Sequence, residues 1–261
     1  FRKGLKYYLT QHKYSNADGQ DLWKSIGRVA HKPVDAMMKT WIDQVGYPVV
    51  DVKRNNSKVS LTQRRFLSDG SISSKNRWAI PIHIEEGNHE SSILMKSQKS
   101  VVSLKNIDSN FIVNSGRYGF YRVQYDANSL AQLELLIDEK ILNHVDRWSL
   151  QNDLFSQCVS GTKQIQEYLD FTTSYHDEDN YITLQNLAQN LYHLYKLTRK
   201  EKFSDEIRTY TAQFLGTIFD RLGWDSQKNE KHTNALLRSF VITALGKLGD
   251  KEILSEANKR F

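Results

Sequence analysis

The 261-residue sequence contains a single cysteine, Cys158, and therefore cannot form a disulfide bond within the chain. A lone thiol favours a reducing compartment, so we predict a cytoplasmic location. Apolar runs are a handful of residues long, short of the roughly 20 residues that a membrane helix needs. The basic start, FRKGLKYYLTQHKY, has a helical period in place of the apolar core of a secretory signal. It also lacks an initiator Met, from which we expect a piece of a longer protein.

The sequence also lacks the common catalytic motifs. A zinc hydrolase helix needs two histidines four residues apart, whereas the nearest match, HESSI at 89–93, has Ile93 in the second ligand position. Neither Gly-x-Ser-x-Gly nor a phosphate-binding Gly-rich loop is present. Cys158 shares a helix face with Leu150 and Leu154, which predicts a buried structural thiol. We therefore predict no catalytic and no metal-binding residue in this chain.

The acidic run Asp177-Glu178-Asp179 does not have the ligand pattern of a calcium loop. It directly precedes a predicted helix, where negative charge favours the helix dipole. We therefore interpret the run as a feature of the helix N-terminus.

Positive charge is spread along the chain and does not form one patch. The net charge is +6 overall, with +4 in residues 1–47, +5 in 48–127 and −3 in 128–261. No nucleic-acid motif accompanies the basic pairs Lys53-Arg54 and Arg64-Arg65. We predict solvated basic surface and no nucleic-acid partner, with a docking surface for an acidic partner as the alternative.

The hydrophobic period changes twice along the sequence. Residues 1–44 have a helical period, with one predicted helix opening at Pro33. Residues 48–127 alternate with a period of two, as at 78–84 and 121–125, and Pro81 favours an edge strand or a bulge. From 128 onward the period is helical again, with about seven helices expected and the last starting near Asp250.

Three stretches, taken in order, resemble one protein family. The first comprises FRKGLKYYL (1–9), DLW (21–23) and WIDQVGYPVV (41–50). The second comprises QRRFL (63–67), WAIP (78–81) and GFYRVQYD (119–126). The third comprises DR (146–147), DLF (153–155), LGW (222–224) and LLR (236–238). Together they resemble the gluzincin aminopeptidases of the aminopeptidase N, puromycin-sensitive and archaeal tricorn-interacting type.

The resemblance implies a multidomain α+β fold. Residues 1–46 resemble the terminal helices of a thermolysin-like catalytic domain, 47–127 a small antiparallel β-sandwich, and 128–261 the first part of a helical, superhelix-like C-terminal domain. It also implies that the zinc ion, the zinc motif and the catalytic residues belong to an upstream catalytic domain. No position here matches them, so we expect this fragment to bind no zinc.

Several residues in the resembling stretches are candidates for domain junctions. We predict that Trp41 and Tyr47 pack the terminal helices onto the sandwich; alternatively they are an ordinary core Trp and a turn Tyr. Arg122 is predicted either to pair with Asp146 or Asp153, seven residues apart on one helix face, or to face water.

The sequence supports two alternative hypotheses about function. In the first, the chain is the middle and C-terminal portion of a zinc aminopeptidase, encloses the chamber for peptide substrates and is inactive alone. In the second, it is a stand-alone module that binds a peptide or a protein.

Overall fold

The computed structural model describes residues 1–73 and 75–261, which form two compact units. The first unit contains residues 1–135 and 157–164, and the second contains residues 136–156 and 165–261. Because the chain returns to the first unit at 157–164, the two units are not simply consecutive in sequence. The division into domains at 46 and 127 stays a prediction.

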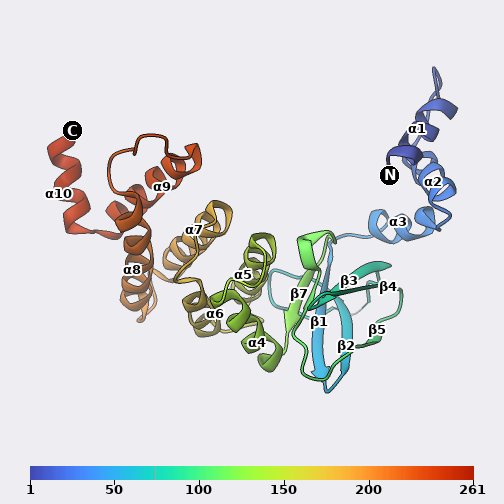
Figure 1. Ribbon diagram of the computed structural model, residues 1–261, viewed down its shortest axis with the longest axis horizontal. Coiled ribbons are helices and arrows are strands. Elements are labelled where there is room, and N and C mark those ends of the chain that lie inside the picture. Colours follow the sequence, from blue (N-terminus) through green and yellow to red (C-terminus); the bar gives the residue numbers. More distant parts are fainter. Residues whose placement is uncertain (74) are drawn as a thin grey trace. The chain divides into compact units, whose positions relative to one another are not determined.

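The first unit begins with three short helices, α1 (Arg2–Gln11), α2 (Gly19–Ala30) and α3 (Val34–Ile42) (Figure 1). The start of α2 is fixed by a capping box, in which the Asp18 carboxylate accepts from the backbone of Gln20 and Asp21. Pro33 immediately precedes α3. On α2 the buried residues are Ser25 and Gly27, whereas the apolar side chains of Leu22, Trp23 and Ile26 are only half-buried.

Seven strands follow, in two sheets. They are β1 (Pro48–Asn55), β2 (Lys58–Arg65), β3 (Ile80–Glu86), β4 (His89–Met95), β5 (Lys99–Ser103), β6 (Phe111–Val113) and β7 (Arg122–Tyr125), with the 3-10 turn η1 (Ser115–Arg117) before β7. One sheet has the order β5-β2-β1-β7 and the other β4-β3-β6. Figure 1 shows the strands gathered in one region, after the helices that begin the chain.

The small β region agrees with the predicted fold class, with one correction to its topology. We predicted an antiparallel sandwich, but β1 and β7 are parallel, from Val49 opposite Arg122 to Val52 opposite Tyr125. No tight turn connects these strands. Between β1 and β7 the chain crosses to the second sheet for β3 and β4, returns for β5, and crosses again for β6. This long connection permits a parallel neighbour.

Tyr125 joins the two sheets. Its ring centroid lies 6.3 Å from that of Phe111 on β6, and its hydroxyl accepts from the Val113 amide at 2.8 Å. The inward side chains of β1 and β3 are completely or almost completely buried, including Val50, Ile80 and Ile82. Alternating apolar residues therefore form a core between the sheets, as the period of two predicted.

Pro81, predicted on an edge strand or at a bulge, lies on β3, the middle strand of its sheet. The neighbour β6 pairs only with residues 84–86 of β3, so at Pro81 the strand has β4 on one side and no paired strand on the other. Pro81 thus lies where its strand is paired on one side alone, the kind of position in which a sheet accepts proline.

Seven helices complete the chain, as expected from the sequence. They are α4 (Ala127–Asp138), α5 (His144–Val159), α6 (Ile165–Thr172), α7 (Tyr181–Thr198), α8 (Ser204–Leu222), α9 (His232–Leu248) and α10 (Lys251–Arg260), with the 3-10 turn η2 (Thr173–Tyr175) after α6. Helix α10 begins as predicted, with the Asp250 carboxylate accepting from the Ile253 amide. The predicted helical array after a small β region is confirmed.

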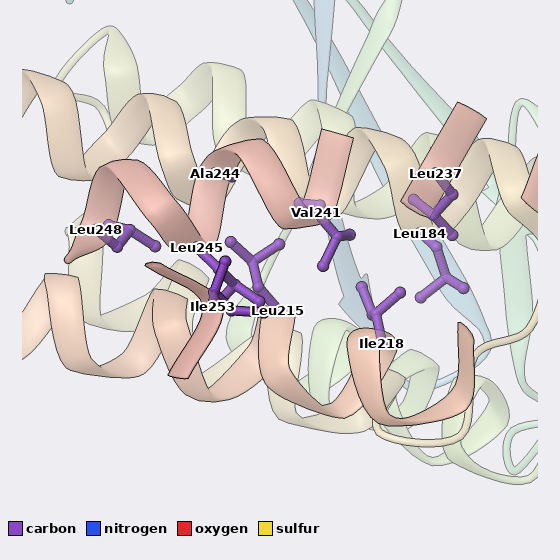
Figure 2. Close-up of a cluster of buried hydrophobic side chains, with 10 residues drawn as sticks. Leu184, Leu215, Ile218, Leu237, Val241, Ala244, Leu245, Leu248 and Ile253 are labelled. Carbon is purple, nitrogen blue, oxygen red and sulfur yellow. The ribbon is translucent and has the colours of Figure 1, made fainter. Parts of the chain in front are cut away.

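The apolar stripes of α7, α8 and α9 meet in one core in the second unit. Leu215 and Ile218 of α8 face Val241 and Leu245 of α9, and Ile253 of α10 reaches the same cluster (Figure 2). These residues recur every three or four positions, so the helical period that predicted the helices also determines which faces pack together.

Candidate functional site

An aromatic cluster in the first unit brings together three of the predicted junction residues. We call it the junction cluster and define it as Trp41, Tyr47, Phe66, Trp78, Phe120 and Arg122. Trp41 on α3 donates from Nε1 to the Ala79 carbonyl at 3.1 Å. Its ring centroid lies 6.3 Å from that of Trp78 and 6.5 Å from that of Phe120. The indole thus connects α3 to the segment that leads into β3.

Two polar side chains beside Trp41 strengthen this connection. The Thr40 hydroxyl accepts from the Ala79 amide at 3.0 Å. The Gln44 amide group donates to the Arg77 carbonyl at 2.8 Å and accepts from the Asn76 side chain at 3.0 Å. Together with the Trp41 hydrogen bond, these contacts fix the end of α3 against residues 76–79. Thr40, on α3, and Gln44, just after its end, were not predicted, because a single polar side chain near a helix end gives no distinctive signal in the sequence.

Tyr47 lies on the same side of the sheet as Arg122. Its ring stacks on Phe66 with centroids 5.2 Å apart and planes at 14°, and lies 5.5 Å from Phe120. The Arg122 Nε donates to the Tyr47 hydroxyl at 3.2 Å, and the guanidinium lies 5.6 Å from the Phe66 ring. Aromatic faces attract a guanidinium, so Arg122 and the two rings stabilise one another.

Trp78 is the fully buried member of this cluster, and its backbone is held by Gln63. The Gln63 side chain accepts from the Trp78 amide at 2.8 Å and donates to the Trp78 carbonyl at 3.0 Å. The Gln63 side chain therefore supplies Trp78, which lies just before β3, with the backbone hydrogen bonds that a neighbouring strand would otherwise provide. Buried backbone groups need such partners, and this one orients Trp78 toward Trp41.

Asp146 and Asp153 both lie on α5 in the second unit and are 1% and 3% exposed. The Asn143 side chain donates to the Asp146 carboxylate at 2.5 Å. Arg122 belongs to the first unit, so its pairing with either aspartate stays a prediction.

The second unit contains a buried ion pair that the sequence analysis missed. Arg147 donates to both carboxylate oxygens of Glu178, at 2.6 and 2.7 Å, and the Glu178 side chain is 1% exposed. Burial alone raises the pKa of Glu178, but hydrogen bonds from Arg147 and from the Asn180 and Asp179 amides lower it below its usual range. Glu178 is thus the buried partner of Arg147, a role beyond the helix-terminus position that the sequence predicts for it.

A second bidentate pair fastens the connection between α8 and α9. Arg238 on α9 donates to the two Glu230 carboxylate oxygens at 2.7 and 2.6 Å, and also to the Leu222 and Gly223 carbonyls at the end of α8. The hydrogen bonds from Arg238 lower the pKa of Glu230. The planar guanidinium is suited to this double role, because its donors can serve a carboxylate and helix carbonyls together.

The described residues offer no place for a metal ion. Among residues 1–73 and 75–261, no group of three or more His, Cys, Asp or Glu side chains could hold one. Residues 89–93, the nearest match to a zinc motif, lie on strand β4. The zinc that the resemblance implies therefore does not fit the residues that the structure describes. In the same part of the chain, no helix is both long and apolar enough to cross a membrane.

Taken together, the geometry is that of a positioning site. The junction cluster contains packed rings, the Arg122 guanidinium beside two of them, and hydrogen bonds to side chains and backbone. In the second unit, the carboxylates of Glu178 and Glu230 are each bound by an arginine. Cys158, predicted to be a structural thiol, is buried and donates to the Gln164 carbonyl at 3.1 Å. Such contacts hold neighbouring elements in place.

Comparison with known proteins gives two family matches at opposite ends of the chain. Residues 1–41 match the family model described as the peptidase family M1 domain, and residues 110–261 match the ERAP1-like C-terminal domain. The chain is 33% identical over 261 residues to the tricorn protease-interacting factor F2 of Thermoplasma acidophilum, and 31% identical over 282 residues to aminopeptidase M1 of Arabidopsis thaliana. Each alignment covers 100% of this chain and 32% of the relative.

A third relative is the probable aminopeptidase 2 of Sulfurisphaera tokodaii, 35% identical over 224 residues, which cover 85% of this chain and 28% of the relative. The chain therefore spans about a third of the length of the curated relatives it matches. The first match contains α1, α2 and nearly all of α3, and the second contains β6, β7 and all seven helices of the array.

Proposed function

Because the chain belongs to the M1 aminopeptidase family, we propose that it works within a zinc-dependent aminopeptidase that removes N-terminal residues from peptides. The observation that carries this proposal is the order of the two family matches, with the M1 peptidase domain before the ERAP1-like domain. In this proposal the zinc ligands and catalytic groups belong to another part of the enzyme. Helices α1–α3 then complete the catalytic domain, and the sheets and helical array enclose the chamber that admits peptides.

The junction cluster supplies the physical basis of this arrangement. Trp41, Thr40 and Gln44 fix the end of α3 to residues 76–79 by side-chain hydrogen bonds. Any domain that contains α3 is therefore held at a defined angle to the sheets. In this proposal one domain encloses the substrate chamber and another contains the catalytic groups. A fixed angle between them keeps the bound peptide correctly placed relative to the catalytic groups.

The test compares the 261-residue chain with the full product of the reading frame that encodes it. We expect that frame to contain a His-Glu-x-x-His segment upstream of Phe1. We expect its product to hold about one zinc ion per chain by elemental analysis and to release amino acids from chromogenic aminoacyl amides. The 261-residue chain alone should do neither. Bound zinc or robust hydrolysis by this chain alone would contradict the proposal.

A start codon just before Phe1 would instead support the other function, a stand-alone module that binds a peptide or protein. In that case, the protein should bind peptides without hydrolysing them.

We also propose a cytoplasmic location for the enzyme. Its support is the single cysteine, Cys158, which is buried and cannot form a disulfide within the chain. Recovery of the full product outside the cytoplasm in cell fractionation would overturn this assignment.

A further inference from the structure

Strand β4 gives the first unit a regular, open edge. It lies at one end of the three-stranded sheet, and within the described residues only β3 pairs with it. All seven of its residues, His89–Met95, pair with β3 in an unbroken antiparallel register, so the strand has no bulge. It contains no proline, and five of its residues are exposed. Folded proteins usually interrupt or cover an edge strand, because an open edge can pair with another chain.

The hydrogen bonds of β3 show which backbone groups of β4 point outward. The His83 carbonyl accepts from the Asn114 amide at 2.7 Å, so the backbone groups of His83 point away from β4. Ser92 is the residue opposite His83. In an antiparallel pair, such a residue makes no ladder bond to its opposite and directs its own N–H and C=O to the other side. By the period of two, the same holds for Glu90 and Leu94.

The outward face of β4 also carries an unfavourable charge pair. Glu90 lies directly opposite Glu85 of β3, and like charges at such positions destabilise a sheet. Glu85 accepts from the Ser115 hydroxyl. The Glu90 side chain is 72% exposed, and His83 Nε2 lies 4.0 Å from its carboxylate, too far for a hydrogen bond. A lysine on the open side of Glu90 would offset the repulsion.

A second copy of β4 supplies that lysine. When two copies pair antiparallel with Ile93 opposite Ile93, Glu90 of one lies opposite Lys96 of the other, and Ser92 lies opposite Leu94. Residues 90, 92 and 94 are those whose amide and carbonyl groups point outward, so they meet as hydrogen-bonded pairs. The two-fold symmetry of the pairing forms the contact between Glu90 and Lys96 twice.

Charge also selects this register over its neighbour. Lys96 is exposed and directly follows β4, so its side chain is available to a second copy. A register shifted by two residues, with Ser92 opposite Ser92, keeps the hydrogen-bonding pattern but places Glu90 opposite Leu94. Only the pairing centred on Ile93 therefore matches the charges.

We propose that β4 is a self-association edge, at which two copies of the protein pair antiparallel through residues 90–96. Glu90 of each copy then lies beside Lys96 of the other. A single strand from each copy buries less surface than the roughly 1,200 Å² of a stable interface, so the dimer forms reversibly at high protein concentration. This surface belongs to the β region and goes beyond the proposed aminopeptidase function, on which it does not depend.

The test measures the association of the full reading-frame product by sedimentation velocity over a range of concentrations. Its average mass should rise toward that of a dimer. Lys96→Glu should weaken association by about tenfold, because both contacts with Glu90 become repulsive. Glu90→Lys combined with Lys96→Glu should restore it. The control Lys58→Glu changes an exposed lysine of β2, which has a strand on each side, and should associate like the wild type.

A cysteine cross-link tests the register. In the proposed pair the two Ile93 residues face each other with Cα atoms about 4.5 Å apart, within the range of a disulfide. Mild oxidation with diamide should therefore convert the Ile93→Cys variant to a covalent dimer. Ser91→Cys is the matched control, since residue 91 lies opposite Met95, and it should remain largely monomeric on a non-reducing gel. The wild type controls for Cys158, which is buried.

Each result bears on the edge alone, because zinc binding and hydrolysis by the full product are separate measurements. Restored association in the charge-swapped variant and cross-linking at residue 93 would support the proposal. A product that stays monomeric at every concentration would overturn it. Association that Lys96→Glu leaves unchanged, or cross-linking through residue 91 in place of 93, would also overturn it.

Discussion

Glu178 loses almost all contact with water on folding, and only Arg147 and two backbone amides compensate for that loss. The Arg147 hydrogen bonds at 2.6 and 2.7 Å are the strongest of these. The same guanidinium donates to the Leu142 carbonyl, and the Arg147 carbonyl accepts from the Tyr175 hydroxyl at 2.7 Å. Burial raises the pKa of Tyr175 well above its usual value, so this hydroxyl stays a donor at any physiological pH. One arginine thus connects four segments of the second unit.

Replacing Glu178 by Gln should lower the free energy of unfolding by about 3 kcal/mol at pH 7, since Arg147 then keeps a buried charge without its counter-ion. Folding lowers the pKa of Glu178 from its usual value of 4.5, so the wild-type advantage is complete above that pH. It is lost as the pH falls through the folded-state pKa. Urea unfolding followed by circular dichroism across this range measures both effects.

Asp177→Asn is the matched control for Glu178→Gln. This neighbouring carboxylate is 73% exposed, and its neutralisation should change stability by less than about 0.5 kcal/mol. A Glu178→Gln variant as stable as this control at pH 7 would show that the buried pair contributes nothing.

Some residues of the candidate site can be predicted from the sequence and others cannot, for a physical reason. Trp41 and Tyr47 were named as candidates because they stand in the stretches that resemble the family, and in the structure both rings lie against Phe120. Glu178 was missed because 31 residues separate it from Arg147, and no local pattern relates the two. Gln63 was missed for the same reason, since its bonds to Trp78 depend on how the chain folds back.

At the scale of elements, helices were predicted better than strands. Seven helices after residue 127 follow directly from apolar periodicity. The parallel direction of β7 does not, because alternation determines which face of a strand is buried and says nothing of its neighbour. The loop between α8 and α9 is another such feature. Residues 223–231 have no regular structure, and Arg238 holds them through Glu230.

We expect Arg238→Lys to increase tryptic cleavage in this loop roughly tenfold, because an ammonium cannot make the bidentate contact and cap α8 together. Lys228 and Lys231 are exposed cleavage sites within the loop. Initial cleavage rates under native conditions, followed by mass spectrometry, give the measurement. The control variant Arg199→Lys changes an exposed position after α7, and its 223–231 loop should be cleaved at the wild-type rate. An unchanged cleavage rate in Arg238→Lys would argue that the Arg238 contacts with Glu230 and the end of α8 do not hold the loop.

For the whole molecule, the important fact is that residues 157–164 return to the first unit. Gln157 at the end of α5 is 2% exposed and donates to the Val123 carbonyl of β7 at 2.9 Å. The chain therefore contributes to the same unit twice, with a stretch of the second unit between. Sequence periodicity could not predict this return, because α5 looks like one uninterrupted helix and its residues belong to both units.

Gln157→Leu should lower the free energy of unfolding of the first unit by about 1–2 kcal/mol, because a buried hydrogen bond is lost. Hydrogen exchange at residues 122–125 should accelerate accordingly, while exchange in α8 and α9 should change little. Gln166→Leu, at an exposed position on α6, is the control. Equal exchange rates in both variants would mean that residues 157–164 do not stabilise β7.

The parallel pairing of β1 with β7 has a consequence for synthesis of the protein on the ribosome. The Arg54 amide at the end of β1 donates to Asp126, 72 residues further along. Strand β1 therefore emerges early but waits for its second neighbour until residues 122–125 have been translated. During that interval, one long edge of β1 is open to wrong partners, so nascent chains halted before β7 should be the species that chaperones bind most.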